Sequence, residues 1–376
     1  AEHLIVVLDN VSPLQQPSPR PPEIHLFVLW EHARPWADRI VADIEKTFRI
    51  LDAIELRWTS ERGPRHFTRL YAQPLPPESQ KLRDCGSGAP LILVLSDDEP
   101  RYGRRRKWGS TYTVNTHLFD AKRRYRALTG GSRVHCTTDV AETEHDLFVL
   151  LGLRSVDYAN RQASRWGRMN RAVERDLTGD GGWASLDEML TAVELTLAYV
   201  RLPDVDAGPE VRLLVAGLSS HCGVEWLISE PDRHPKGAET RCYPATIEGR
   251  EVVVELRHVG DGHHARAWQE GMLERRVRDS GGTFVLPPDD AFLELSHELV
   301  RRGASAPGDV RRLDDLARAA GLTAPGPSGL DVARERLEAA LRQRGYDKGP
   351  APTDPDGPRP SLVSVLADRL GIYLRR

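Results

Sequence analysis

A dense group of cationic residues precedes a glycine turn in the first half of the chain. Lys122 and Arg126 are four residues apart in a stretch with helical periodicity, so both project from one face of the expected helix. The stretch ends in Thr129, Gly130 and Gly131, and such a turn can present backbone N–H groups to an anion. Cations that converge on it are what a diphosphate or phosphosugar requires. The same pattern also fits a solvated basic helix with an ordinary glycine end.

The next helical stretch, residues 139–151, carries a histidine among acids. His145 lies beside Asp146 and three residues after Glu142, and an imidazole oriented by a carboxylate can act as a general base. Acids also belong in the first turn of a helix because of its dipole. Asp139 and Glu142 have the spacing of a capping box, which accounts for both without a catalytic role.

Two acids, Asp97 and Asp98, end the most apolar run of the chain, residues 90–98. Side chains at the end of a strand in an α/β sheet often face a ligand. The pair could hold ribose hydroxyls or a magnesium–diphosphate complex, or it could begin the turn that follows.

The other metal-ligating residue types form no recognised site pattern. The segment GDGHH, residues 260–264, has adjacent histidines but no further ligands at the spacing of a metal site, so we expect a loop there. The cysteines lie far apart with no CxxC pair, which predicts reduced thiols and neither a disulfide framework nor a zinc site. They are Cys85, Cys136, Cys222 and Cys242.

Strands and helices alternate around these residues, which predicts an α/β fold with a mainly parallel sheet in the first half. The expected strands are 4–11, 24–30, 50–58, 90–98 and 133–138, and the expected helices are 35–48, 116–128 and 139–151. The second half is predicted as an α+β domain. Its expected elements are a helix at 185–200, strands near 211–216, 225–229, 239–246 and 251–258, later helices, and a C-terminal helix at 361–376.

Length and charge bound the class of protein. With 376 residues, the chain is long enough for two domains, which we predict as 1–157 and 184–376, joined by a polar interdomain segment at 158–183. The formal net charge of −3 argues against a nucleic-acid partner. No run of eighteen apolar residues and no signal-peptide pattern occurs, so we expect a cytoplasmic protein without a transmembrane segment.

Residues 35–155 resemble a family of bacterial proteins from surface-polysaccharide gene clusters, which includes glycan-specific phosphoribosyltransferases. The resemblance is carried by VNTHLFDAKRRYRALTGGSRVHCTTDVAETEHDLFVLLG and by the upstream HFTRLYAQPLPPESQKLRDCGSGAPLILVLSDD. The matching positions are Val114, Asn115, Phe119, Asp120, Ala121, Lys122, Tyr125, Arg126, Thr129, Gly130, Gly131, His135, Glu142, His145 and Asp146.

The resemblance implies transfer of a 5-phosphoribosyl group from phosphoribosyl pyrophosphate to a sugar hydroxyl of a glycan acceptor. His145 would be the base and His135 the second choice, while Asp97 or Asp98 would hold Mg²⁺ or the ribose diol. The implied donor-phosphate ligands are Lys122, Arg126, Thr129, Gly130 and Gly131, with Arg69 and Lys81 at the 5-phosphate. It also implies a phosphatase module as a partner, and a place at the inner face of the membrane in an assembly complex.

The second half resembles the nucleotidyltransferase-like region that follows this block in such proteins. Active nucleotidyltransferases carry an Asp-x-Asp pair that holds two metal ions, whereas this chain has Glu210 and Arg212 there and Glu255 at the third position. Because an arginine would repel magnesium, we expect a scaffold or acceptor-binding domain. The alternatives to ribosyl transfer are a sugar-nucleotide or alditol-phosphate transferase of the same pathway and a non-catalytic assembly module.

Overall fold

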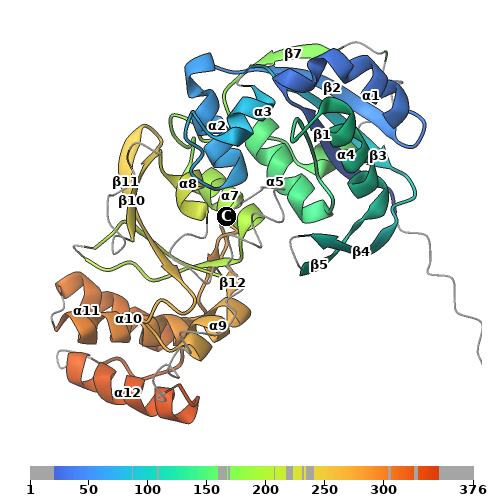
Figure 1. Ribbon diagram of the computed structural model, residues 1–376. Coiled ribbons are helices and arrows are strands. Elements are labelled where there is room, and N and C mark those ends of the chain that lie inside the picture. The colour runs from blue at the N-terminus through green and yellow to red at the C-terminus, as the bar shows by residue number, and fades with distance from the viewer. Residues whose placement is uncertain are drawn as a thin grey trace, which may run out of the picture.

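The structure is a computed structural model that describes residues 21–346, except 87, 108–109, 160–166, 168–169, 207, 217–222, 231–232, 234–240, 304–305 and 326–328. The expected strand at 4–11 and the expected helix at 361–376 lie outside the described residues. The chain forms a mixed α/β protein with one large sheet in each half (Figure 1).

The first sheet has the strand order β6-β1-β3-β2-β7. Its strands are β1 (Glu23–Leu29), β2 (Arg49–Arg57), β3 (Leu91–Asp97), β6 (Val134–Cys136) and β7 (Arg171–Glu174). The apolar β3 is buried along its whole length at the centre. It runs antiparallel to both β1 and β2, and β6 is antiparallel to β1, so that only the β2–β7 pair is parallel.

The prediction of a mainly parallel first sheet is therefore wrong. The β1–helix–β2 segment has the order of a parallel crossover unit, but β3 lies between β1 and β2 and runs against both. This is a split arrangement, in which alternation of strands and helices does not reveal the direction of the inserted strand.

Helices cover both faces of the first sheet. Successive apolar side chains of β1 point to opposite faces, so each face has a core that a helical layer covers. Phe27 and Leu29 pack with α1 (Ala37–Ile44) and α4 (Thr116–Thr129) in one core cluster. Leu26 and Val28 face the other cluster. That second side carries α2 (Gly63–Tyr71), α3 (Gln80–Cys85), α5 (Val140–Leu151) and the short α6 (Ser155–Ala159).

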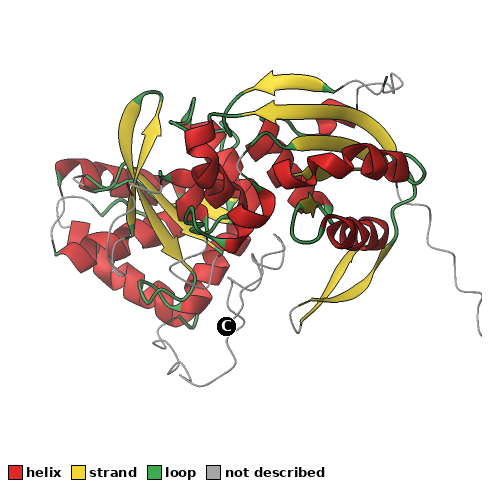
Figure 2. Cartoon of the chain, turned by 45° about the horizontal axis from the view of Figure 1, so that its top comes forward, coloured by secondary structure: helices red, strands yellow, loops and turns green. Residues whose placement is uncertain are grey.

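Short elements complete the first half. The 3₁₀ helices η1 (Glu31–Trp36) and η2 (Ser60–Arg62) precede α1 and α2. The strands β4 (Tyr102–Lys107) and β5 (Ser110–Asn115) form a separate antiparallel hairpin that extends away from the helical layer (Figure 2). We did not predict this hairpin, because its arginine-rich first strand lacks the apolar alternation of a half-buried strand.

The second sheet has the order β10-β11-β9-β8-β13-β12 and mixes parallel with antiparallel pairs. Its strands are β8 (Tyr199–Arg201), β9 (Val211–Val215), β10 (Cys242–Ile247), β11 (Arg250–His258), β12 (Val277–Arg278) and β13 (Phe284–Val285). Its helices are α7 (Leu186–Thr196), α8 (Val224–Ile228), α9 (Arg266–Arg275), α10 (Pro288–Arg302), α11 (Pro307–Ala319) and α12 (Gly329–Gln343). We expected a strand at 225–229, but these residues belong to the helix α8. For such a short apolar run, periodicity alone does not distinguish a strand from a helix.

One apolar core connects the two halves. It joins side chains of α2 and α5 to those of α7, α8 and the second sheet, while a separate cluster lies between that sheet and helices α9 to α12. Part of the expected interdomain segment is the strand β7, which pairs with β2 of the first sheet. In the described part of the chain, no helix has the length and apolar character needed to cross a bilayer.

Candidate functional site

The cations Lys122 and Arg126 lie on one face of α4, as their spacing predicts. Asn115 caps the helix by accepting hydrogen bonds from the N–H groups of His117 and Leu118. Lys122, only 6% exposed, donates from Nζ to the carbonyl of Cys136 at 2.8 Å, and Arg126 Nε donates to the carbonyl of Val134 at 2.8 Å.

Lys81 of α3 reaches the segment just before β6. Its Nζ donates to the carbonyl of Ser132 at 3.3 Å and lies 4.5 Å from the centre of the Tyr71 ring. Three cations therefore bind alternate carbonyls: that of residue 132, just before β6, and those of residues 134 and 136 in β6, which is an edge strand among the described residues. Each ammonium or guanidinium group has further N–H donors beyond that one bond.

Burial changes the acidity of these cations. It lowers the pKa of Lys81 to about 8, and it lowers the pKa of Lys122 as well. The charge of Arg126 lowers both values further. An anion that reached the three side chains would relieve this repulsion.

His135 lies on β6 between the two carbonyls bound by the α4 cations, and it faces Asp146 of α5. His135 Nε2 is 2.7 Å from Asp146 Oδ2, and His145 Nδ1 is 3.0 Å from Asp146 Oδ1. One buried carboxylate thus joins two imidazoles. Asp139 begins α5 by accepting a hydrogen bond from the N–H of Glu142 at 2.8 Å, which fixes the first turn that carries these groups.

The protonation states follow from burial and contacts. Burial by itself raises the pKa of Asp146, but its contacts with His135 and His145 outweigh that effect and hold the pKa at about 2. Burial lowers the pKa of His135 to about 4. An ionised Asp146 accepts the N–H of each ring, so the opposite ring nitrogens carry lone pairs. Among the described residues, His135 Nδ1 has no hydrogen-bond partner.

Glu142 completes the group, although the sequence explains it as a capping residue. Its Oε2 accepts a hydrogen bond from the N–H of Thr138 at 2.7 Å, and its Oε1 lies 3.9 Å from His135 Nε2. Burial raises the pKa of Glu142 to about 8, against the opposing charge of Lys122. Glu142 is therefore mostly protonated at neutral pH. We call the whole group the α4–α5 site: Lys81, Lys122, Arg126, His135, Glu142, His145 and Asp146.

The glycine turn does not form the expected anion nest. The N–H groups of Gly130 and Gly131 both donate to the carbonyl of Arg126, and Thr129 Oγ1 donates to the carbonyl of Tyr125 at 2.9 Å. Gly130 adopts the left-handed conformation at the helix end (φ 78°). This is the ordinary glycine end of a helix, so these three positions do not fit the role of phosphate ligands.

Asp97 and Asp98 do not fit a shared magnesium site. Asp97 is buried and accepts a hydrogen bond from Asn115 Nδ2 at 2.7 Å. Asp98 is half-exposed and accepts hydrogen bonds from Arg49, whose Nη2 lies 2.8 Å from its Oδ1. The two carboxylates are thus committed to different partners.

Arg69 lies apart from the α4–α5 site. It is 1% exposed, donates from Nη2 to the carbonyl of Leu227 at 2.8 Å, and stacks on Trp183 with its guanidinium carbon 5.3 Å from the ring. These contacts tie α2 to the second half of the chain. Its guanidinium therefore does not fit the expected place at a 5-phosphate.

Two members of the surroundings escaped the sequence analysis. The Tyr71 ring lies edge-on to His135 with 6.0 Å between ring centres, and Cys85 Sγ donates to the carbonyl of Ser132 at 3.3 Å. The only sequence signal was their place in the HFTRLYA and DCGSG segments, which carry part of the resemblance but assign these two residues no role.

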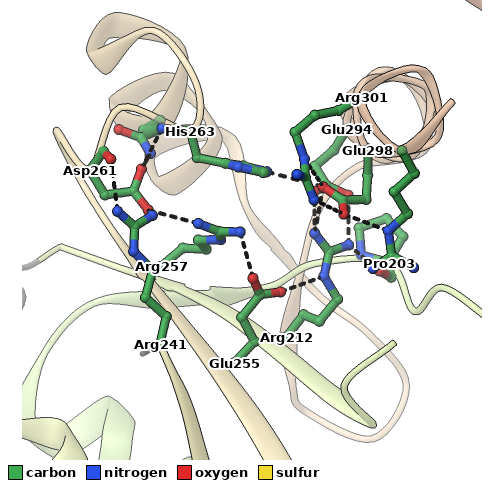
Figure 3. Close-up of polar contacts among 12 residues, drawn as sticks. Pro203, Arg212, Arg241, Glu255, Arg257, Asp261, His263, Glu294, Glu298 and Arg301 are labelled. Atoms are coloured by element: carbon green, nitrogen blue, oxygen red, sulfur yellow. Dashed lines mark hydrogen bonds and ion pairs between the residues drawn. The ribbon is translucent and has the colours of Figure 1, made fainter. Parts of the chain in front are cut away.

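In the second half, Arg212 lies among carboxylates of β11 and α10. Its Nε donates to Glu255 at 2.9 Å, and its Nη2 lies 3.1 Å from Glu294 and 3.6 Å from Glu298 (Figure 3). Arg212 is fully buried among these carboxylates, and its positive charge balances theirs.

Comparison with known proteins adds no relative. No family model matches the chain, and searches of curated proteins and of solved structures find no significant similarity.

Proposed function

We propose that this chain is a glycosyltransferase of surface-polysaccharide synthesis that moves a 5-phosphoribosyl group from phosphoribosyl pyrophosphate to a sugar hydroxyl. One observation carries the proposal: three cations from two helices meet beside a His–Asp–His group in the α4–α5 site. The identity of the donor rests on the resemblance of residues 35–155 to the polysaccharide-cluster family.

The reaction needs charge stabilisation and a base. The bond between the anomeric carbon and the pyrophosphate oxygen breaks with both electrons going to pyrophosphate, and the acceptor oxygen bonds to the same carbon. Lys122, Arg126 and Lys81 would stabilise the negative charge on the departing group. His145, oriented by Asp146, would take the proton of the acceptor hydroxyl.

An unsatisfied donor favours an anionic ligand over a purely structural cluster. Arg126 Nη2 is buried and has no hydrogen-bond partner among the described residues, and leaving such a donor unpaired costs about 1–3 kcal/mol. A phosphate oxygen would satisfy it. His135, neutral at pH 7, adds no charge of its own, so the attraction for the donor comes from the three cations.

For the second half, we propose a degenerate nucleotidyltransferase-like domain that acts as a scaffold or binds the acceptor glycan. The buried Arg212–carboxylate group supports this view, because it takes the place that metal-binding acids occupy in the active enzymes. The same observation favours a second candidate, a non-catalytic assembly module. Either function would place the chain in the cytoplasm, at the inner face of the membrane beside a phosphatase and the polysaccharide-assembly proteins.

Donor binding tests the proposal. A ligand at about 100 times its dissociation constant stabilises a protein by about 2.7 kcal/mol, so phosphoribosyl pyrophosphate with Mg²⁺ in solution should raise the melting temperature. CDP-, UDP- and GDP-sugars at equal concentration should not. A shift with a nucleotide sugar alone would favour the sugar-nucleotide transferase, and silence from every donor would favour the assembly module.

A matched pair of variants assigns the binding to the α4–α5 site. Lys122→Met removes a buried ammonium group, whereas Arg123→Met removes an exposed cation from the next position of the same helix. We expect the first variant to weaken donor affinity at least about tenfold, or about 1.4 kcal/mol, and the second to leave it unchanged. Equal affinities in the two variants would contradict the assignment.

A further inference from the structure

Three histidines meet in the second half, far from the α4–α5 site in the sequence. His263 and His264 follow β11 in the GDGHH loop, and His297 lies on α10. The ring centres of His264 lie 4.5 Å from His263 and 4.4 Å from His297, and those of His263 and His297 are 5.2 Å apart. One potential ligand atom from each ring lies within 4.8 Å of the other two.

The middle ring of this triad, His264, has no hydrogen-bond partner among the described residues. His264 is 6% exposed, and neither of its ring nitrogens has a hydrogen-bond partner among the described residues. His297 Nδ1 is likewise buried without a partner. Buried polar atoms are normally paired, and a metal ion bound by the three imidazoles would satisfy these nitrogens.

We propose that His263, His264 and His297 bind a divalent transition-metal ion, with Zn²⁺ as the ion that suits them best. Imidazole ligands favour zinc, copper, nickel and cobalt over magnesium and calcium, which prefer oxygen. Zinc–nitrogen bonds of about 2.1 Å place the ligands of a tetrahedral site about 3.4 Å apart.

The loop that carries two of the ligands is held by contacts outside the triad. Asp261 Oδ1 accepts hydrogen bonds from the N–H of His263 at 2.9 Å and from Gln269 Nε2 at 2.8 Å, and Gln269 Oε1 accepts one from the N–H of Gly260 at 2.7 Å. The other oxygen of Asp261 pairs with Arg241 and lies 3.5 Å from Arg257 (Figure 3). The loop is thus fixed before any ion arrives, which favours binding.

The surroundings also suit a bound cation. Glu298 Oε2 lies 3.2 Å from His263 Nε2, and a carboxylate in this position orients a metal-ligating imidazole and increases its basicity. Arg212 is close, but its positive charge is balanced by the carboxylates of Glu255, Glu294 and Glu298.

The ion would tie the β11–α9 loop to α10. Trp268 of α9 packs on the triad, with its ring centre 4.5 Å from His264 and 5.6 Å from His297, and closes one side with apolar surface. Three protein ligands leave a fourth coordination position for water or an exogenous ligand. Because the triad belongs to the second sheet and its helices, this inference stands or falls independently of the proposed ribosyl transfer.

Metal titration of the full chain without an affinity tag tests the proposal. We expect one equivalent of Zn²⁺ to bind and to raise the melting temperature, and Co²⁺ to give the visible absorption of a tetrahedral site with nitrogen ligands. Chelator should reverse both changes. The absence of stoichiometric Zn²⁺ binding, or Co²⁺ spectra identical to those of the aqueous ion, would overturn the proposal.

Variants of the same residue type locate the ligands. His297→Gln should weaken Zn²⁺ binding at least about tenfold, because it removes one of three ligands. His258→Gln serves as the control, since His258 ends β11 outside the triad. Circular dichroism of metal-free samples checks that each variant folds. Equal Zn²⁺ affinity in the two folded variants would assign the ion elsewhere and contradict the triad; if His297→Gln does not fold, the wild-type Co²⁺ spectrum decides.

Discussion

Asp146 binds two imidazoles at once, and this arrangement gives the α4–α5 site its chemistry. Each carboxylate oxygen faces one ring, at 2.7 Å from His135 Nε2 and 3.0 Å from His145 Nδ1. An anionic acceptor at this place fixes the tautomer of both rings. A neutral group of the same shape cannot do so, because it has one acceptor and one donor.

Asp146→Asn should therefore abolish most of the activity and spare donor binding. The amide N–H₂ group must face one of the two rings, which leaves that ring without its proton acceptor. We expect at least about a hundredfold loss in rate, within the range typical of a displaced general base, and less than a threefold change in donor affinity. Pyrophosphate release from phosphoribosyl pyrophosphate, with water as acceptor, measures the rate.

Glu144→Gln is the control for this substitution, because Glu144 lies two residues away and pairs with Arg154 at the edge of α5. Its rate should equal that of the wild type. Similar losses in both variants would mean that the helix, and not the orientation of the two imidazoles, limits the reaction.

Glu142 makes stability depend on pH in a direction unusual for an acid. Its pKa is raised to about 8 in the folded chain, against an ordinary value of 4.5. Between these values the folded state holds more protons than the unfolded state, so the free energy of unfolding falls as the pH rises from 4.5 to 8. One unit of pKa shift corresponds to about 1.4 kcal/mol.

Glu142→Gln removes this dependence. Relative to the variant, the wild type should be more stable at pH 5 than at pH 8 by at least about 1 kcal/mol, as measured by urea unfolding at both values. A difference of the opposite sign would mean that the buried carboxyl is ionised and paired with Lys122 throughout.

At the level of residues, the sequence predicted side chains on one element better than side chains from several. The spacing of Lys122 and Arg126 fixed their common helix face, and His145 was placed beside its carboxylate. Lys81 joins them only because α3 brings it to the carbonyl of Ser132, far away in the sequence. Glu142 was explained by capping alone, since its pKa depends on a burial that spacing does not show.

Among the features of the helices and strands, strand direction was the main one that could not be predicted from the sequence. The apolar runs that became β1, β2 and β3 were located correctly, but their order in the sheet depends on long-range pairing. Helix ends were more accessible, because capping is local: Asp139 caps α5 and Gly130 ends α4, as the capping-box spacing and the glycine turn indicated. The end of β3 and the start of α4 nevertheless share a contact that no local pattern shows.

Asn115 has two roles there, and its loss should cost more than that of a simple cap. Its Oδ1 caps α4, and its Nδ2 donates to the buried Asp97 at 2.7 Å. Asn115→Ala removes a cap worth about 1 kcal/mol and leaves a buried carboxylate without this donor, at a further cost of about 1–3 kcal/mol.

Asp139→Ala, which removes only the cap of α5, should cost about 1 kcal/mol. Urea unfolding of the two variants measures the difference. Because the extra cost for Asn115 depends on Asp97, it should shrink in an Asp97→Ala background. Equal losses for Asn115→Ala and Asp139→Ala would show that the contact with Asp97 contributes nothing.

For the whole molecule, the core that joins the two halves predicts cooperative unfolding. Apolar side chains of both sheets belong to one cluster, and Arg69 adds polar bonds from α2 to the carbonyls of Leu227 and Thr178. Two domains joined by a mere linker would lack such contacts.

Arg69→Met tests this coupling, and it also distinguishes a cation with a structural role from the cations proposed to bind the donor. The substitution leaves buried carbonyls without their donor and removes the stacking on Trp183, so we expect the free energy of unfolding to fall by about 2–4 kcal/mol. Donor affinity should stay unchanged, in contrast to Lys122→Met. Arg83→Met on the exposed side of α3 is the control for both measurements.

Calorimetry should show one transition for the wild type and one, at lower temperature, for Arg69→Met. If only one of two resolved transitions moves, the halves unfold separately, and the shared core does not couple them.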